Sequence, residues 1–123
     1  MISLPSTTDK LQAFLGGAAA TTNPTVMVFY HDLQLTEKPD ANEYPIGFQS
    51  TVLAGTTETD VLDAPGQNVC RHIDIINVYN PDTARVVVTV CIDENGTNRI
   101  LVSKTIITGQ ALVYNAQSGW QVI

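Results

Sequence analysis

The sequence predicts an all-β protein, an antiparallel, jelly-roll-like β-sandwich of about eight or nine strands. One observation is that short runs rich in valine, isoleucine and threonine recur along the 123 residues. A second is that turn residues, mostly glycine, asparagine and proline, separate these runs. The third is Asn95-Gly96, a dipeptide that tolerates the two successive positive φ values of a tight hairpin. Because the chain is near the commonest domain size, we expect one domain over residues 1-123.

The clearest strand in the second half of the chain is Val69 to Tyr79 (VCRHIDIINVY). Strict alternation puts Ile73 and Ile75 on one face of this strand but Ile76 and Val78 on the other. A β-bulge near Ile75-Ile76 would restore a single apolar face, and the sequence predicts a bulge there.

From residue 67 onward the chain reads as a β meander, in which each strand pairs with the next. Arg85 to Asp93 (RVVVTVCID) places Val86, Val88, Val90 and Ile92 on the face that we expect in the core. The strands expected after it are Arg99 to Ile107, Ala111 to Tyr114 and Trp120 to Ile123.

The first half of the chain is less regular. Leu11 to Leu15 alternates as a strand would, and we favour a strand over the short helix that Ser6-Thr7-Thr8-Asp9 could cap. Leu35 to Pro45 is a polar, proline-bearing loop of a length that usually exposes something functional or mobile. The remaining expected strands are Thr25 to His31, Phe48 to Leu53 and Thr57 to Leu62.

The composition excludes several classes of partner. Charged residues make up 15% of the chain, apolar residues 44%, and the net charge is −6. The six basic residues are scattered, which argues against binding to nucleic acid or an anionic membrane, since both need a basic patch. So little charge predicts a chain that folds and hides part of its surface in an assembly.

The expected redox state of the two cysteines depends on the cellular compartment. No apolar run approaches the roughly 20 residues of a membrane helix. The opening MISLPSTTDK lacks the basic and apolar segments of a signal peptide, so we expect synthesis in a cytoplasm. Cys70 and Cys91 are then expected to be reduced, buried thiols, with a disulfide between them as the alternative.

Histidine and carboxylate pairings are few. They are His31-Asp32 and His72 with Asp74, whose spacing of two places both side chains on one strand face. Cys70 could join that face. A metal ion there is a minor alternative to a solvated surface, because a zinc site takes three or four protein ligands.

Other chemistry is weakly supported. Asp93, Glu94 and Asn95 gather oxygen atoms at a hairpin tip, but they lack the regular spacing of a calcium loop, so turn chemistry is the favoured interpretation. No serine lies in a nucleophile elbow, and Gly16-Gly17 is not followed by the lysine of a phosphate-binding loop. We therefore expect no catalytic residue, no metal, no cofactor and no enzyme activity.

Several segments together carry a resemblance: Ser6 to Gln12 (STTDKLQ), Val78-Tyr79-Asn80 followed by Asp82-Thr83, Asn95-Gly96-Thr97, and Gly109 to Leu112 leading to Gly119-Trp120. In these pieces the chain resembles the capsid decoration, or cement, proteins encoded in the head gene clusters of tailed bacteriophages. The resemblance covers about two thirds of the chain, and residues 33–67 do not share it. It implies a β-sandwich on the outer capsid surface of the virion, bound to the major capsid protein as a homo-oligomer, with a trimer favoured over a dimer.

Four residues are the candidate interface: Ile2, Leu4, Tyr44 and Phe48. Ile2 and Leu4 belong to residues 1-8, which could form an extended N-terminal arm reaching a neighbouring subunit. The competing function is a host-recognition or carbohydrate-binding module of a phage fibre, since exposed aromatic rings can stack on sugars. The other aromatic residues weighed for that role are Phe29, Tyr30, Tyr79, Tyr114 and Trp120.

Overall fold

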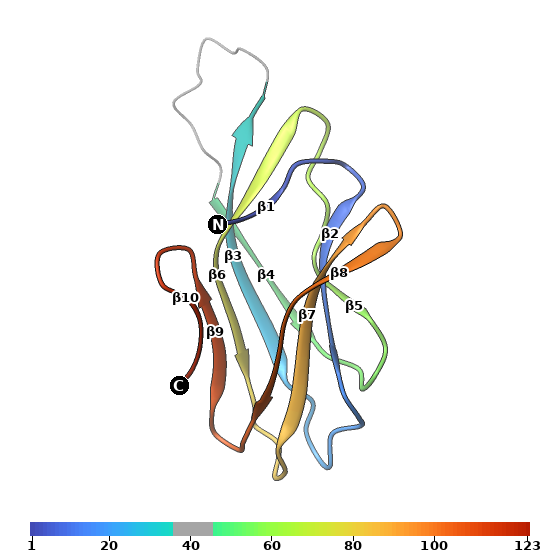
Figure 1. Cartoon of the computed structure of the whole chain (residues 1–123), viewed down its shortest axis with the longest axis vertical. Helices are drawn as coiled ribbons and strands as arrows, with labels where there is room; N and C mark the ends of the chain where they lie inside the picture. Colours follow the sequence, from blue (N-terminus) through green and yellow to red (C-terminus); the bar gives the residue numbers. More distant parts are fainter. Residues whose placement is uncertain (36–45) are drawn as a thin grey trace.

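The computed structural model describes residues 1–35 and 46–123, and all regular structure in them is β-strand. Two antiparallel sheets pack face to face (Figure 1). The predicted β-sandwich is therefore confirmed. The strands are β1 (Ile2–Leu4), β2 (Asp9–Leu15), β3 (Thr25–Gln34), β4 (Ile46–Val52), β5 (Thr59–Leu62), β6 (Val69–Tyr79), β7 (Val86–Glu94), β8 (Thr97–Ile106), β9 (Ala111–Asn115) and β10 (Gly119–Val122).

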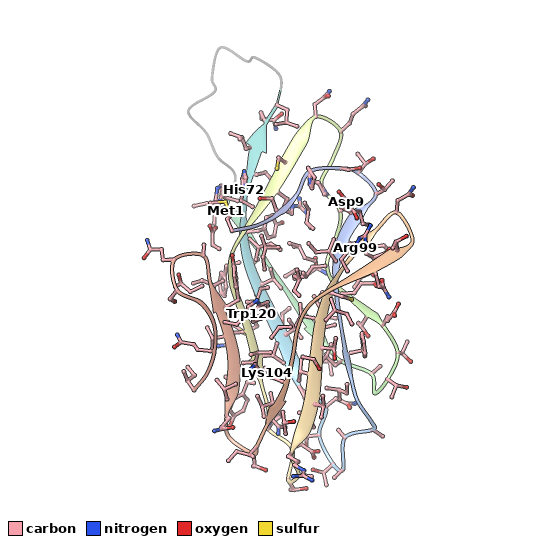
Figure 2. The ribbon with its side chains drawn as sticks, viewed as in Figure 1. Met1, Asp9, His72, Arg99, Lys104 and Trp120 are labelled. Carbon is pink, nitrogen blue, oxygen red and sulfur yellow. The ribbon has the colours of Figure 1, made fainter. Side chains whose placement is uncertain are left out.

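The two sheets differ in size. The larger one, sheet A, has the order β10-β9-β6-β3-β4, with β1 also paired to β6, and the smaller one, sheet B, has the order β5-β2-β7-β8. Figure 2 shows side chains filling the space between them. The largest fully buried side chains form one core, drawn from both sheets: Leu4, Leu11, Leu15, Val26, Val28, Leu53, Val61, Leu62, Ile73, Ile76, Ile106 and Leu112.

A β-bulge in β6 sets which of its residues face the core. Phe29 of β3 lies opposite Ile75, but the next residue, Tyr30, lies opposite Ile73, so Asp74 is the extra residue. Because of this extra residue, Ile73 and Ile76 are both fully buried while Ile75 is exposed. The bulge predicted from the apolar pattern is present, one residue before the predicted position.

The β7–β8 hairpin forms as its sequence predicts. Glu94 pairs with Thr97, which leaves Asn95 and Gly96 as a two-residue loop with φ values of 51° and 90°. Asp93 Oδ1 accepts a hydrogen bond from the Gly96 amide at 2.8 Å, which is turn chemistry. On β7, Val88 is fully buried and Val87 on the opposite face is exposed.

Two expectations from the sequence need correction. Residues 69–123 are not a meander, because β6 pairs with β9 while β7 pairs with β8 in the other sheet. The N-terminal residues are not an extended arm either: β1 pairs antiparallel with β6, and Leu4 is fully buried in the core. The described residues contain ten strands, and β1 is the one whose range the sequence did not predict. The favoured strand at Leu11 to Leu15 is confirmed as part of β2.

The connection from β6 to β7 carries the chain from one sheet to the other and contains a buried carboxylate. Asp82 is fully buried and accepts hydrogen bonds from the amides of Ala20, Thr21 and Thr22 at 2.8 to 3.1 Å. These hydrogen bonds hold the pKa of the Asp82 carboxyl well below its ordinary value of 3.8, and the bond from the Ala20 amide has the largest effect. Asp82 thereby ties the loop after β2 to the loop after β6.

Candidate protein-interaction face

The outer face of sheet A carries several exposed apolar side chains. Side chains alternate along a strand, and in β4 the outward positions include Ile46, Phe48 and Val52, which are 83%, 59% and 58% exposed. Met27 of β3 with Ile75 and Tyr79 of β6 adds three more exposed apolar residues. We call these six residues the apolar face: Met27, Ile46, Phe48, Val52, Ile75 and Tyr79.

A row across three strands passes through the apolar face and includes the half-buried Phe29 of β3. Phe29 lies opposite Phe48 on one side and opposite Ile75 on the other. The two phenylalanine rings stack with centroids 5.5 Å apart and an interplanar angle of 22°. Cross-strand aromatic pairs of this kind hold both rings in defined positions, so the row is an ordered surface.

Sheet B presents a different outer surface. Lys10 Nζ lies 3.2 Å from Asp60 Oδ2, and Gln12 Nε2 donates to Asp60 Oδ1 at 2.7 Å. Near the hairpin tip, Arg99 Nε lies 3.0 Å from Glu94 Oε2. These ion pairs contrast with the middle of the apolar face, where the outward residues between Phe48 and Val52 on β4 and between Ile75 and Tyr79 on β6 are uncharged.

A polar cluster lies where β1 pairs with β6, the end of sheet A at which Figure 2 places His72. His31 and His72 are opposite each other in register, and their rings stack with centroids 5.2 Å apart. His31 Nδ1 is 2.9 Å from Asp74 Oδ2, and His72 Nδ1 is 2.8 Å from Ser3 Oγ. Sequence reasoning missed this cluster, because its members come from three strands.

The partners suggested by the sequence are rearranged. Asp32 does not pair with His31; it accepts two hydrogen bonds from Arg71, at 2.8 and 3.0 Å. The Arg71 guanidinium also lies over the ring of Tyr30, 4.3 Å from its centroid. The hydrogen bonds that Arg71 donates to Asp32 raise the pKa of Arg71, so the guanidinium stays charged in this largely buried ion pair.

The four candidate interface residues do not lie together in the structure. Phe48 is exposed on the apolar face, and its role as an interface residue stays a prediction. Leu4 is in the core and Ile2 is half-buried opposite Ile73, so neither projects from the molecule. Tyr44 lies outside the described residues, as does most of the loop expected at Leu35 to Pro45.

The cysteines are free, Cys91 fully buried and Cys70 half-buried. Burial raises the pKa of Cys91 to about 11 and also raises the pKa of Cys70, so neither is a reactive thiolate at neutral pH. Among the residues that the structure describes, no group of three or more histidine, cysteine, aspartate or glutamate side chains is placed to hold a metal ion. None of the described segments is a helix that could cross a membrane.

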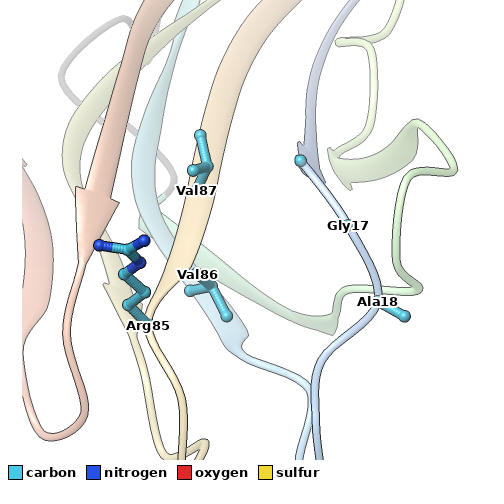
Figure 3. A pocket seen from close by; sticks show the side chains of 6 residues that line it. Gly17, Ala18, Arg85, Val86 and Val87 are labelled. Carbon is cyan, nitrogen blue, oxygen red and sulfur yellow. The ribbon is translucent and has the colours of Figure 1, made fainter.

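A small pocket of about 240 Å³ lies between the end of β2 and the start of β7, lined by Gly16, Gly17, Ala18, Arg85, Val86 and Val87. Arg85 is the charged residue in this lining. Figure 3 shows its guanidinium on the far side of β7 from Gly17 and Ala18, so the charge does not converge with the glycine segment. The pocket therefore brings together no pair of groups for acid-base or nucleophilic chemistry.

Comparisons with protein families, curated proteins and solved structures found no match to this chain. The apolar face and the histidine cluster therefore have to be interpreted from their own geometry. The signal for the apolar face was present in the sequence of β4, IGFQSTV, where alternation places large apolar residues at the outward positions.

Proposed function

We propose that this protein is a virion structural protein, a capsid decoration or cement protein that binds the outer surface of the major capsid protein shell and stabilises it. The observation that carries the proposal is the apolar face on sheet A. Contiguous exposed apolar surface on a folded domain marks a site where another macromolecule docks. The motifs that resemble phage decoration proteins supply the identity of that macromolecule.

The chemistry of the apolar face suits docking onto protein. Its residues lose water without leaving a charge unpaired, and burial of apolar surface contributes roughly 25 cal/mol per Å². The phenylalanine rings Phe29 and Phe48 are already stacked on each other, so they are fixed before a partner arrives and lose little side-chain entropy on binding.

Binding to an intact shell would stabilise it by mass action. A ligand that binds only the intact state adds about 2.7 kcal/mol per site at a hundred times its dissociation constant. Neighbouring copies can bind cooperatively as a homo-oligomer, for which we favour a trimer. With a net charge of −6 on each copy, uncharged contacts between copies avoid like-charge repulsion.

The test is to add purified protein to heads that lack it and to measure the melting temperature of the heads. The wild-type protein is expected to bind and raise it, whereas Phe48→Glu is expected to abolish both effects by placing a charge in the interface. Ile100→Glu is the matched control, since Ile100 is 68% exposed on β8 of sheet B and lies off the apolar face.

Three outcomes would count against the proposal. These are a wild-type protein that does not bind heads, equal binding by Phe48→Glu and wild type, and a strictly monomeric mass both in solution and on the shell. Binding to a glycan array, lost in Phe48→Glu, would support the competing carbohydrate-binding module of a phage fibre.

A further inference from the structure

Strand β4 is an edge of sheet A. It pairs with β3 along its whole length, from Ile46 to Val52, without a shift in register. In the described part of the chain no other strand pairs with it. Alternate backbone N–H and C=O groups of β4 therefore point away from β3 with no strand to receive them. An edge of this kind can accept a further strand into the sheet.

The other edge strands in the described residues are protected, whereas β4 is not. Strands β1, β5 and β10 have only three or four residues each. Strand β8 is longer, but it carries Arg99 and Lys104, and a register shift interrupts its pairing with β7. Short length, charged side chains and bulges are the means by which natural sheets prevent edge-to-edge pairing. Strand β4 (IGFQSTV) is seven residues long and contains no charged residue, no proline and no register shift.

We propose that β4 pairs antiparallel with β4 of a second copy of this chain, so that the two copies share one continuous sheet. A two-fold contact centred on Gln49 pairs all seven residues of each strand. Ile46 then lies opposite Val52 of the second copy, and Phe48 lies opposite Ser50. Each of these contacts occurs twice, as a two-fold interface requires.

The chemistry of β4 suits a second copy. Each copy has a net charge of −6, so two copies approach most easily where the contact is uncharged. Ile46 and Val52 are 83% and 58% exposed in the single copy, and in the pair they cover each other, since opposite Cβ atoms lie about 5 Å apart. The Asp63 amide donates to Gln49 Oε1 at 3.1 Å, and Arg71 donates to the Asp63 carbonyl at 2.8 Å, which places a positive charge beside this acidic residue.

The pairing also affects the apolar face, although the inference does not rest on the proposed function. Residues that lie opposite each other in this register come from the same side of β4, because side chains alternate with a period of two. The apolar faces of the two copies therefore lie on one side of the joined sheet, next to each other. The contact makes the free protein a dimer, whereas the resemblance favours a trimer, so the mass of the free protein distinguishes the two.

The experiment measures the mass of untagged full-length protein by sedimentation equilibrium over a range of concentrations. A dimer, twice the chain mass of 13.3 kDa, is expected. Ile46→Lys and Val52→Glu should each weaken the dimer by about 10-fold or more, because each places a charge against an apolar side chain. The double variant should regain most of this affinity, since the new lysine of one copy faces the new glutamate of the other. Within one copy these two positions are about 20 Å apart along the strand, too far to pair.

Ile100→Lys is the matched control, because Ile100 is 68% exposed but lies on β8 of sheet B, and it should leave the dimer unchanged. A wild-type circular dichroism spectrum in each variant would show that weaker association is not caused by unfolding.

Three results would overturn the inference. The first is a wild-type protein that is a monomer, which would leave the β4 edge to a strand of another protein, or a trimer. The second is a double variant that associates no better than the single variants, and the third is equal weakening by Ile100→Lys. A trimer that binds heads would leave the proposed function intact, whereas a dimer that does not bind heads would contradict the proposed function alone.

Discussion

Truncation of Val88 tests the packing between the two sheets. Val88 is fully buried on β7, which lies between β2 and β8 in sheet B, so the neighbouring strands cannot easily close a gap. Val88→Ala removes two methyl groups, which costs about 1.6 kcal/mol at about 0.8 kcal/mol per buried carbon. The cavity left behind adds about 1 kcal/mol, giving about 2.6 kcal/mol of lost unfolding free energy.

This loss converts to a temperature that is simple to measure. Unfolding entropy is about 2.1 cal/mol/K per residue, or about 0.26 kcal/mol/K for this chain of 123 residues. The melting temperature of Val88→Ala should therefore fall by about 10 °C. Differential scanning calorimetry measures this shift directly.

The control is the next residue on the same strand. Val87 points to the opposite face and is 40% exposed, so Val87→Ala should lower the melting temperature by less than about 4 °C. Val88→Asp should go further and largely unfold the chain, because it buries an unpaired charge. Equal melting temperatures for Val88→Ala and Val87→Ala, or an unchanged melting temperature for Val88→Asp, would refute the assigned core.

Three further outcomes follow from described contacts. The pKa of Asp82 is low in the folded state, so the stability that its carboxylate contributes is present above about pH 4, the ordinary carboxyl range, and is lost as pH falls towards the folded pKa. Asp82→Asn should therefore have a lower melting temperature than the wild type at pH 7, and its melting temperature should fall less between pH 7 and pH 2. Parallel pH profiles of the two proteins would contradict this. In Cys70→Ser protein, Cys91 should resist a thiol reagent at pH 8 until denaturant is added, because burial raises its pKa to about 11; rapid native labelling would be the opposite result. Gly96 has a φ of +90°, so Gly96→Ala should lower the unfolding free energy measured by chemical denaturation by about 1 kcal/mol. Gly66→Ala is the control and should leave the unfolding free energy almost unchanged, because Gly66 has open space around it. Similar losses in the two variants would argue against a strained turn at Gly96.

Local patterns in the sequence were sufficient to predict every described strand except β1. The run from Val86 to Glu94 alternates strongly enough to place Val88 in the core, and Asn95-Gly96 determines the hairpin because few dipeptides accept its backbone angles. Even the bulge in β6 follows from its apolar residues, since Ile73 and Ile76 would lie on opposite faces under strict alternation and cannot share one core without an extra residue.

Which strands pair, apart from those joined by a tight hairpin such as β7 and β8, was beyond local reasoning. The turn residues between Ile106 and Ala111 are the same whether the chain folds back in one sheet or crosses to the other, and here it crosses. The pairing of β1 with β6 was missed for the same reason, since Ile2 and Leu4 are too few to form a pattern. The histidine cluster depends on the pairing of β6 with β3 and with β1, which are both distant in sequence, so no local motif could have predicted it.

The extra residue at Asp74 also determines how the length of β6 can vary. Deleting that one residue while the rest of β6 stays in register would exchange the faces of residues 69–73, because side chains alternate with a period of two. His72 would turn towards the core and Ile73 towards solvent, so the histidine pair and the core packing of Ile73 would be lost together. A homologous chain that lacks one residue here should therefore show a matching loss in β3 or a reversed polar pattern over these five positions.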